Sequence, residues 1–268
     1  MAEIPAITPT ASKDAFAPIA AHYDTLMEHV DYGRWLHVAL ALGEMLPRPL
    51  FHLDVGCGTG IFMQGLDGPD WKTTGMDLSR AMVRVAREQR RHPRLAQADM
   101  RRPPFHEQFH LVSCLFDSLN FLLHEEHVEE ALRGMANALK PGGLLYFDVV
   151  TARMVSDHFD NEAWTEHHGR VKSAWRSKYD KSAKVCATGV RVNAGVESVT
   201  YERVYPLDFL ADAVARAGLS LLIMGDAKAW RKPGRRTTRV DFVAVKGEER
   251  LYRTAFKNVE AAVKRYDG

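Results

Sequence analysis

The hydrophobic and polar positions follow two alternating patterns up to about residue 150. Short apolar runs end near residues 55, 77, 99, 116 and 150, and stretches with apolar residues three or four positions apart lie between most of them. The short runs predict strands and the spaced stretches predict helices. Strands that alternate with helices are typical of a parallel, doubly wound α/β sheet, whose ligands bind beyond the carboxyl ends of the strands.

Single residues set several of the expected boundaries. Residues 14–46 have helical spacing and are stopped by Pro47, while Ser79 is expected to cap a helix that runs to Arg91 before Pro93. A further helix is predicted over residues 128–139, ended by a Lys-Pro-Gly-Gly turn at residues 140–143. The strand after that turn is expected over residues 144–150.

Beyond residue 150 the pattern changes. The alternation over residues 198–205 predicts antiparallel strands within residues 160–205, rather than further strand–helix units. A helix over residues 206–217 and strands over 219–224 and 240–245 then complete the sheet. The last helix is expected within residues 248–266, as an amphipathic helix packed on the body or, as the less favoured option, one that binds a partner. Its predicted apolar face comprises Leu251, Ala255, Val259, Ala262 and Tyr266.

Composition restricts the class of protein without selecting a function. The chain has 268 residues, 46% of them hydrophobic, and a formal net charge of +2, so charge alone demands neither nucleic acid nor membrane as partner. Neither a membrane-spanning run nor the apolar core of a signal peptide is evident, which predicts a cytoplasmic protein. The three cysteines form no Cys-x-x-Cys pair and the twelve histidines show no metal-binding spacing. We therefore expect no metal site and no disulfide framework.

The candidate chemistry begins at a glycine-rich turn after the first predicted strand. Gly56, Gly58 and Gly60 follow Asp54 in the sequence Leu-Asp-Val-Gly-Cys-Gly-Thr-Gly. Such turns bind several nucleotide-like cofactors, and the spacing alone does not select one. A carboxylate at Asp54 would repel a pyrophosphate, but it suits a ligand with a cationic amino group.

Two more acidic residues end the next two strands. Asp77 lies nineteen positions after Gly58, where a carboxylate can accept hydrogen bonds from both ribose hydroxyls. Asp99 is followed by Met100 and is placed to accept from the exocyclic amine of adenine, or else to pair with Arg101 or its neighbour. Three acidic residues around one glycine turn indicate a binding site for an adenosine that carries an amino acid. S-adenosyl-L-methionine fits this description, with S-adenosyl-L-homocysteine as product, and NAD fits poorly.

These motifs also carry a family resemblance. Val-Gly-Cys-Gly-Thr-Gly, Gly-Met-Asp-Leu-Ser, Ala-Gln-Ala-Asp-Met-Arg and the stretch around residues 139–149 resemble the successive motifs of class I S-adenosylmethionine-dependent methyltransferases over residues 15–150. Residues 23–35, 116–122 and 204–210 resemble small bacterial methyltransferases with a β-rich insert after strand five. The stretches at residues 98–101 and 116–122 also resemble sugar-amine N-methyltransferases.

The resemblance implies a Rossmann-like, mostly parallel seven-stranded sheet and an EC 2.1.1 transferase. It implies an N-terminal helical lid over residues 1–46 and a cofactor-binding core over 47–150. A β-rich substrate insert would span 151–205, residues 206–247 would complete the core sheet, and 248–268 would form the C-terminal helix. The implied activity is methyl transfer to a nitrogen or oxygen of a small molecule, by a monomer or homodimer. An RNA or protein methyltransferase, or a cofactor-binding module without turnover, is the alternative.

The expected cofactor contacts gather around the ends of the first four strands and the lid. Within the lid, packing between helices is an equal alternative for each residue. Cys57 is expected to be a small filler in the turn rather than a reactive thiol. The full predicted set is Tyr23, Tyr32, Trp35, Asp54, Gly56, Cys57, Gly58, Gly60, Asp77, Leu78, Met82, Asp99, Met100, Phe116, Asp117 and Ser118.

The catalytic group and the acceptor are less well specified. Asp117, His124, Tyr179 and Tyr201 are candidate bases because they lie near the expected cleft and insert. None stands out, which favours an amine acceptor over a hydroxyl. The absence of an Asp/Asn-Pro-Pro-Tyr motif after strand four disfavours base methylation. Two arginine-rich stretches are potential nucleic-acid contacts, although the first also suits a solvated helix face: residues 80–94 and 231–239.

Overall fold

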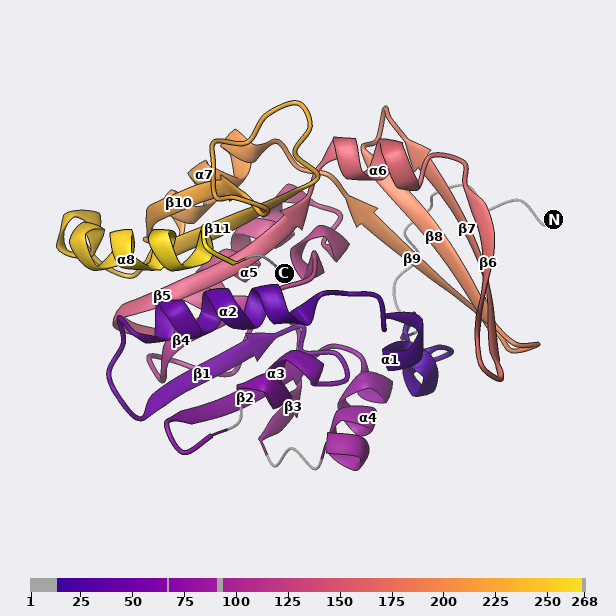
Figure 1. Cartoon of the computed structure of the whole chain (residues 1–268), viewed down its shortest axis with the longest axis horizontal. Helices are drawn as coiled ribbons and strands as arrows, with labels where there is room; N and C mark the ends of the chain where they lie inside the picture. The colour runs from indigo at the N-terminus through magenta and orange to yellow at the C-terminus, as the bar shows by residue number, and fades with distance from the viewer. Residues whose placement is uncertain (1–13, 67, 91–93, 267–268) are drawn as a thin grey trace.

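The computed structural model describes residues 14–66, 68–90 and 94–266. A seven-stranded sheet in the order β10-β11-β5-β4-β1-β2-β3 forms its centre (Figure 1). The neighbouring strands β5, β4, β1, β2 and β3 are all parallel to one another, whereas β11 runs antiparallel to both β5 and β10. The predicted doubly wound, mostly parallel sheet is therefore confirmed. Its strands are β1 (Leu50–Val55), β2 (Trp71–Asp77), β3 (Leu95–Gln97), β4 (Phe109–Cys114), β5 (Leu139–Val150), β10 (Ser220–Asp226) and β11 (Arg239–Val245).

Helices bury both faces of this sheet. On one face Leu53, Val112 and Phe147 join the apolar sides of α5 (Glu125–Ala138) and α7 (Leu207–Arg216). On the other face Leu50 and Tyr146 pack against α2 (Tyr32–Gly43), α3 (Ile61–Gly65) and α8 (Arg253–Val263). The strands read as near-continuous apolar runs because both faces are covered. The remaining helical elements are η1 (Ala20–His22), α1 (Tyr23–Leu26), α4 (Arg80–Arg90), η2 (Ser118–Phe121), α6 (Ala152–His158) and η3 (Glu249–Leu251).

The segment after β5 forms a second sheet, as the alternation predicted. Its four antiparallel strands follow the order β6-β7-β8-β9 and extend away from the seven-stranded sheet (Figure 1). Residues 14–26 lie between the two sheets, where Ile19 and Leu26 pack against Val190 and Val192 of β8. The strands are β6 (Ala163–His168), β7 (Val171–Asp180), β8 (Val185–Val192) and β9 (Glu197–Arg203).

Several boundaries differ from the sequence-based expectation. The helical pattern of residues 14–46 breaks into η1, α1 and α2, because Asp31 accepts a hydrogen bond from Arg34 N and starts a new helix. The expected turn at residues 140–143 lies inside β5, where the pairing with β4 shifts register. Ser79 caps α4 as predicted, accepting from Met82 N. Arg91, Pro93 and the expected tail over residues 1–13 lie outside the described residues.

The C-terminal helix packs through a face that only partly matches the expected one: Val259 is buried as predicted, but Ala255 is exposed. Phe256, Val259 and Val263 are buried against the sheet, whereas Leu251 is 71% exposed. The helix starts only at Arg253, so Leu251 precedes it and the apolar stripe is set by Phe256 instead. Among the described residues, no helix has the length and apolar character needed to cross a bilayer.

Candidate functional site

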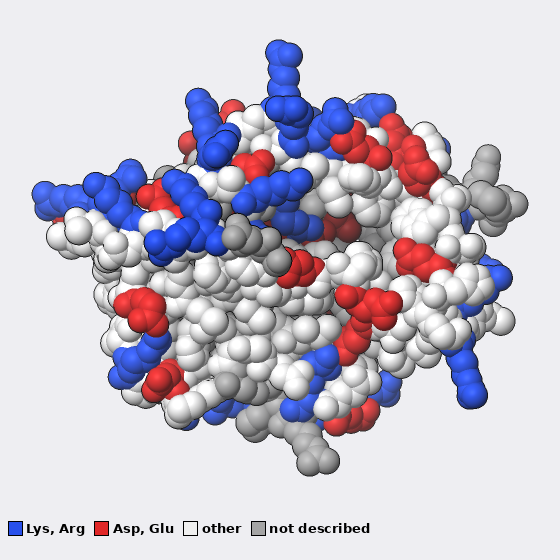
Figure 2. All heavy atoms as spheres, viewed as in Figure 1, with Lys and Arg blue, Asp and Glu red and all other residues white. Residues whose placement is uncertain are grey.

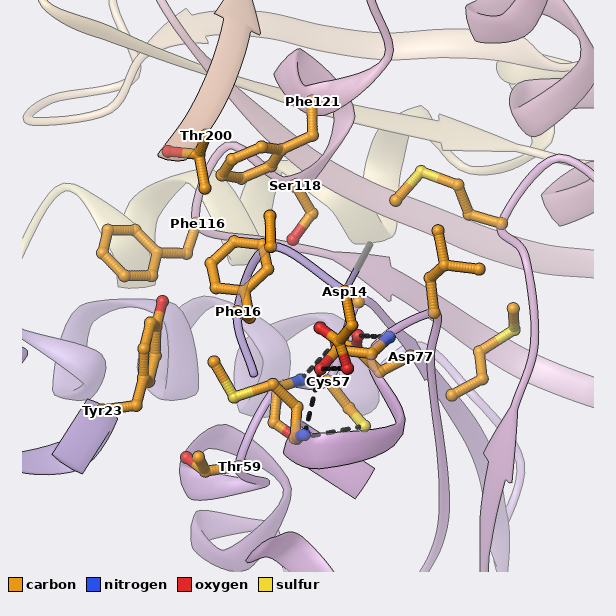
Figure 3. Close-up of a pocket in the computed structure, with 18 of the residues that line it drawn as sticks. Asp14, Phe16, Tyr23, Cys57, Thr59, Asp77, Phe116, Ser118, Phe121 and Thr200 are labelled. Atoms are coloured by element: carbon orange, nitrogen blue, oxygen red, sulfur yellow. Dashed lines mark hydrogen bonds between the residues drawn. The ribbon is translucent and has the colours of Figure 1, made fainter. Parts of the chain in front are cut away.

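A cavity of about 1470 Å³ lies at the carboxyl edge of β1, β2 and β4. The glycine turn forms part of its floor, residues 14–18 pass over it, and residues of β9 line the side toward the insert (Figure 3). The cavity is lined by fourteen of the sixteen predicted cofactor contacts: Tyr23, Tyr32, Trp35, Asp54, Gly56, Cys57, Gly58, Asp77, Leu78, Met82, Asp99, Met100, Phe116 and Ser118. Gly60 and Asp117 are not among the described residues that line it.

The glycine turn needs its glycines for two separate reasons. Gly56, Gly58 and Gly60 all have positive φ, at 73°, 54° and 82°, which side-chain-bearing residues rarely adopt. A Cβ on Gly56 would also lie 2.7 Å from Ser118 Oγ, so the turn and the segment after β4 approach closely. Gly60 is the residue before α3 rather than a cavity contact. Backbone is thereby exposed to the cavity without a side chain in between.

Asp77 is held rigidly at the end of β2. Its carboxylate accepts hydrogen bonds from Gly58 N at 2.9 Å and from Ser79 N at 2.8 Å. Burial raises the pKa of Asp77, and these two amide donors act in the opposite direction by favouring the charged form. Asp14 lies beside it and accepts from Ser79 Oγ at 2.9 Å (Figure 3). The carboxylate expected to bind ribose is therefore fixed in place and faces the cavity.

Asp54 lies beneath the glycine turn and is 3% exposed. It accepts a hydrogen bond from Ser113 Oγ at 2.6 Å. Burial raises the pKa of Asp54 to about 7, the Ser113 hydrogen bond lowers it, and Asp77 raises it further. A cationic group that enters the cavity would favour the charged carboxylate.

Asp99 has the alternative partner that the sequence allowed. Arg101 Nε donates to both carboxylate oxygens, at 3.0 and 2.9 Å, and Arg101 Nη2 forms an ion pair with one oxygen at 2.5 Å. This hydrogen bonding is the main reason that the pKa of Asp99 is lowered. Asp99 and Arg101 both line the cavity, so an adenine amine would share the carboxylate with Arg101.

Aromatic side chains line the cavity between the cofactor end and the insert. The Phe116 ring centre lies 5.5 Å from that of Trp35 and 6.3 Å from that of Tyr32. The ring centres of Phe16 and Phe121 lie 5.4 Å apart, and no local pattern in the sequence indicates either residue. Arg34 points away from this group, because its guanidinium binds Asp241 at 2.5 Å. Tyr32, Trp35 and Phe116 therefore line the cavity, whereas Arg34 does not.

Residues 14–26 are fastened to the core by carboxylates. Asp24 accepts from Thr59 Oγ1 and from Arg90 Nη2, each at 2.5 Å. Asp14 accepts from Ala81 N at 3.2 Å in addition to Ser79. These contacts join segments more than thirty positions apart, so no local sequence pattern indicates them. That the segment opens as a lid stays a prediction.

The candidate bases separate in space. Tyr201 lines the cavity from β9. Tyr179 packs instead with Val150 and Cys186 in a small apolar cluster, and His124 is exposed at the start of α5, 3.9 Å from Glu126. These two lie outside the described lining of the cavity, which disfavours them as bases.

Asp117 is directed into a buried ion-pair network. It lies 2.8 Å from Arg239, which also pairs with Asp148. The Arg239 guanidinium lies over the Phe116 ring, 5.6 Å from its centre, so the network forms the support behind that ring. Glu202 shares a hydrogen bond with Asp117, and burial raises the pKa of Glu202 well above its usual range. Asp117 is thus placed to support the cavity wall, and Arg239 does not belong to an exposed basic surface.

The other arginine-rich stretches have mixed environments. Arg90 binds Asp24 and Arg94 Nε donates to Thr73 O, whereas Arg80, Arg84 and Arg87 are exposed on α4. The loop between β10 and β11 presents five exposed cations. Figure 2 shows Lys and Arg concentrated over α8 and this loop, on the upper left of the face in view. The loop residues are Lys228, Arg231, Lys232, Arg235 and Arg236.

Comparison with known proteins agrees with this geometry. Residues 53–143 match the family model described as a methyltransferase domain. Over these residues the chain is similar to methyltransferases. An S-adenosylmethionine-dependent methyltransferase from Clostridium acetobutylicum ATCC 824 superimposes with a TM-score of 0.75 at 24% identity, over 86% of this chain and 98% of that one. The similarity to methyltransferases that the motifs indicated is therefore confirmed over residues 53–143, and the fold is shared over most of the chain.

Two curated methyltransferases match this chain over part of their length. YqeM of Bacillus subtilis (strain 168) is 33% identical over 59% of this chain and 64% of its own length, slightly less than two thirds. The dTDP-3-amino-3,6-dideoxy-α-D-glucopyranose N,N-dimethyltransferase of Streptomyces fradiae is 28% identical over 49% of this chain and 53% of its own. Similarity is thus distributed unevenly along the chain.

Proposed function

We propose that this protein transfers a methyl group from S-adenosylmethionine to an amine nitrogen of a small-molecule acceptor. The observation that carries the proposal is the joint placement of Asp54 and Asp77 around the glycine turn, in one cavity of about 1470 Å³. Asp54 suits the cationic amino group of the cofactor, Asp77 suits the ribose hydroxyls, and Asp99 with Met100 lies where the adenine would bind. When bound, S-adenosylmethionine supplies an electrophilic methyl group.

The walls of the cavity fit a cationic methyl donor. Tyr32, Trp35 and Phe116 lie together on one side, and aromatic faces stabilise a nearby positive charge by about 0.5–2 kcal/mol. They also exclude water from the reacting atoms. The contribution of the protein is then mainly alignment of donor and acceptor in a closed site, which is sufficient for an electrophile of this strength.

Charge and side-chain chemistry favour an amine as acceptor. The described cavity lining contains five carboxylates and two arginines, so it is acidic in balance: Asp14, Asp54, Asp77, Asp99, Glu197, Arg80 and Arg101. It contains no histidine among the described residues, and a hydroxyl acceptor would need a general base. An amine needs only to lose a proton. The Streptomyces fradiae relative, whose name describes N,N-dimethylation of an amino sugar, supports the same choice.

The test separates binding from turnover and identifies the class of acceptor. Calorimetry with S-adenosylhomocysteine should show binding to the wild type and strongly weakened binding to Asp77→Ala. Incubation with methyl-labelled S-adenosylmethionine and a fractionated cell extract should then label small amines, and amino sugars should be methylated directly. Label in RNA, with affinity that falls steeply as salt rises, would instead assign the exposed loop of residues 228–236 to nucleic acid. Binding without any labelled product would indicate a module that lacks turnover.

A further inference from the structure

Four polar residues of β1, β2 and β4 form a continuous hydrogen-bonded row inside the main sheet. His52 and Asp54 of β1 point to the same face, and the pairing places Thr73 of β2 beside His52 and Ser113 of β4 beside Asp54. All four are at most 3% exposed. His52 Nε2 lies 2.8 Å from Ser113 Oγ, and His52 Nδ1 lies 3.4 Å from Thr73 Oγ1. The row ends with Ser113 Oγ donating to Asp54 at 2.6 Å.

The direction of the hydrogen bonds follows from the acceptor at the end of the row. A charged Asp54 can only accept, so the single hydroxyl proton of Ser113 is directed to it. Ser113 Oγ must then accept from His52, which places the ring proton on Nε2 and leaves Nδ1 to accept from Thr73. Burial lowers the pKa of His52 to about 3, so the ring is neutral and has one N–H to donate. Each group in the row thereby has one defined role.

Removing polar groups from water costs stability, and hydrogen bonds within the row offset that cost only in part. Apolar residues surround the row, and the His52 ring packs edge-on against Phe62 and Trp71, with ring centres 6.0 and 5.8 Å away. Apolar side chains of similar size in these positions would avoid the cost of removing polar groups from water. Only one member of the row, Asp54, lines the cavity.

We propose that Ser113, oriented by His52, is a positioning residue that holds Asp54 in its charged, cavity-facing state for the amino group of the cofactor. This inference rests on the proposed function, since it assigns the device that prepares one contact of that same site. Ser113 itself does not touch the ligand. After burial, Asp77 of β2, which faces Asp54, also raises the pKa of Asp54. The charge of Asp54 in turn adds to burial in raising the pKa values of Tyr32 in α2, Cys57 in the glycine turn and Cys114 in β4.

The experiment compares two variants that each remove one buried hydroxyl. Ser113→Ala removes the donor to Asp54, whereas Ser173→Ala removes a buried hydroxyl of β7 that lies outside both the row and the described cavity lining and serves as the matched control. The dissociation constant for S-adenosylhomocysteine is measured by calorimetry between about pH 6 and 9. The ratio of variant to wild type is taken at each pH, so that titration of the ligand cancels.

Loss of a hydrogen bond to a charged carboxylate should raise the pKa of Asp54 by about one unit. Since wild-type Asp54 titrates near pH 7, Ser113→Ala should bind about tenfold more weakly at pH 6 but within about twofold at pH 9. Ser173→Ala should stay within about twofold of wild type at every pH. Ser113→Cys, a weaker donor of similar size, should show the same pH dependence with smaller amplitude and provides a second variant if Ser113→Ala does not fold.

A deficit for Ser113→Ala or Ser113→Cys that is constant across pH would indicate a merely structural effect and overturn the inference. Binding equal to wild type at all pH values would overturn it as well. Either result would leave the proposed function standing as long as the wild type binds S-adenosylhomocysteine. Absence of wild-type binding would instead refute the proposed function together with this inference.

Discussion

Asp24 offers the most direct test of whether residues 14–26 control access to the cavity. It is the only described residue of α1 that bonds both Thr59, next to the glycine turn, and Arg90 at the end of α4. If this segment must detach before a ligand leaves, Asp24→Ala should weaken the closed state and speed ligand release. The cavity floor should be unaffected, because Asp24 lies outside the cavity lining.

The magnitude follows from the two contacts and their exposure. Hydrogen bonds to charged groups contribute about 1.5–3 kcal/mol each when buried. The Arg90 side chain is 11% exposed and that of Asp24 is 30% exposed, so solvent screens part of this energy. We expect a combined loss of about 2 kcal/mol, which corresponds to a release rate about thirtyfold higher.

The assay is stopped-flow displacement of S-adenosylhomocysteine, with tryptophan fluorescence as the signal from Trp35 in the cavity wall. Glu44→Ala is the control, because the Glu44–Arg48 pair is an i,i+4 surface contact with Glu44 80% exposed and should contribute only about 0.3–0.5 kcal/mol. It should leave the release rate unchanged. A release rate for Asp24→Ala within about twofold of wild type, with the fold intact by circular dichroism, would refute the reasoning.

Three further predictions follow from the site and the core. Asp77→Asn should weaken S-adenosylhomocysteine binding by about tenfold or more in calorimetry, whereas Asp99→Asn should weaken it less, because Arg101 already occupies that carboxylate. Phe256→Ala should lower the free energy of unfolding in urea by about 3–5 kcal/mol, and an equal effect of Leu251→Ala would contradict the assigned helix face. Burial raises the pKa of Asp54 to about 7, so between about pH 4 and 7 the folded state binds a proton that the unfolded state has released. The free energy of unfolding of the ligand-free protein should therefore fall as pH rises through this window. The fall should be smaller in Asp54→Asn.

The sequence predicted the main sheet and the central part of the cavity lining because their signals are local. A buried strand, a glycine turn and an acid at a strand end each depend on a few adjacent residues. Asp54, Asp77 and the glycines are therefore recognisable from their immediate neighbours along the chain. The helix starting after Ser79 is recognisable for the same reason, since one side chain caps it.

The remaining features depend on contacts between distant segments. The pairing of Asp24 with Arg90 spans 66 positions, and that of Asp117 with Arg239 joins the segment after β4 to the start of β11. Asp117 was predicted as a cofactor contact from its position after β4, but the backbone there is left-handed at both Phe116 and Asp117, which turns the carboxylate toward Arg239. Phe16 gave no signal, because its partner Phe121 lies in another segment.

The strand β9 contributes both to the second sheet and to the cavity wall, and this bears on how specificity can change over time. It belongs to the four-stranded sheet through its pairing with β8, and residues near its start line the cavity that the seven-stranded sheet otherwise builds. Substitutions in β9 can therefore reshape this side of the cavity while the glycine turn, Asp54 and Asp77 stay untouched. Under the proposed function, the seven-stranded sheet would hold the methyl donor and the smaller second sheet would help to select the acceptor. Selectivity could then change through the second sheet without a change in the residues proposed to bind the cofactor.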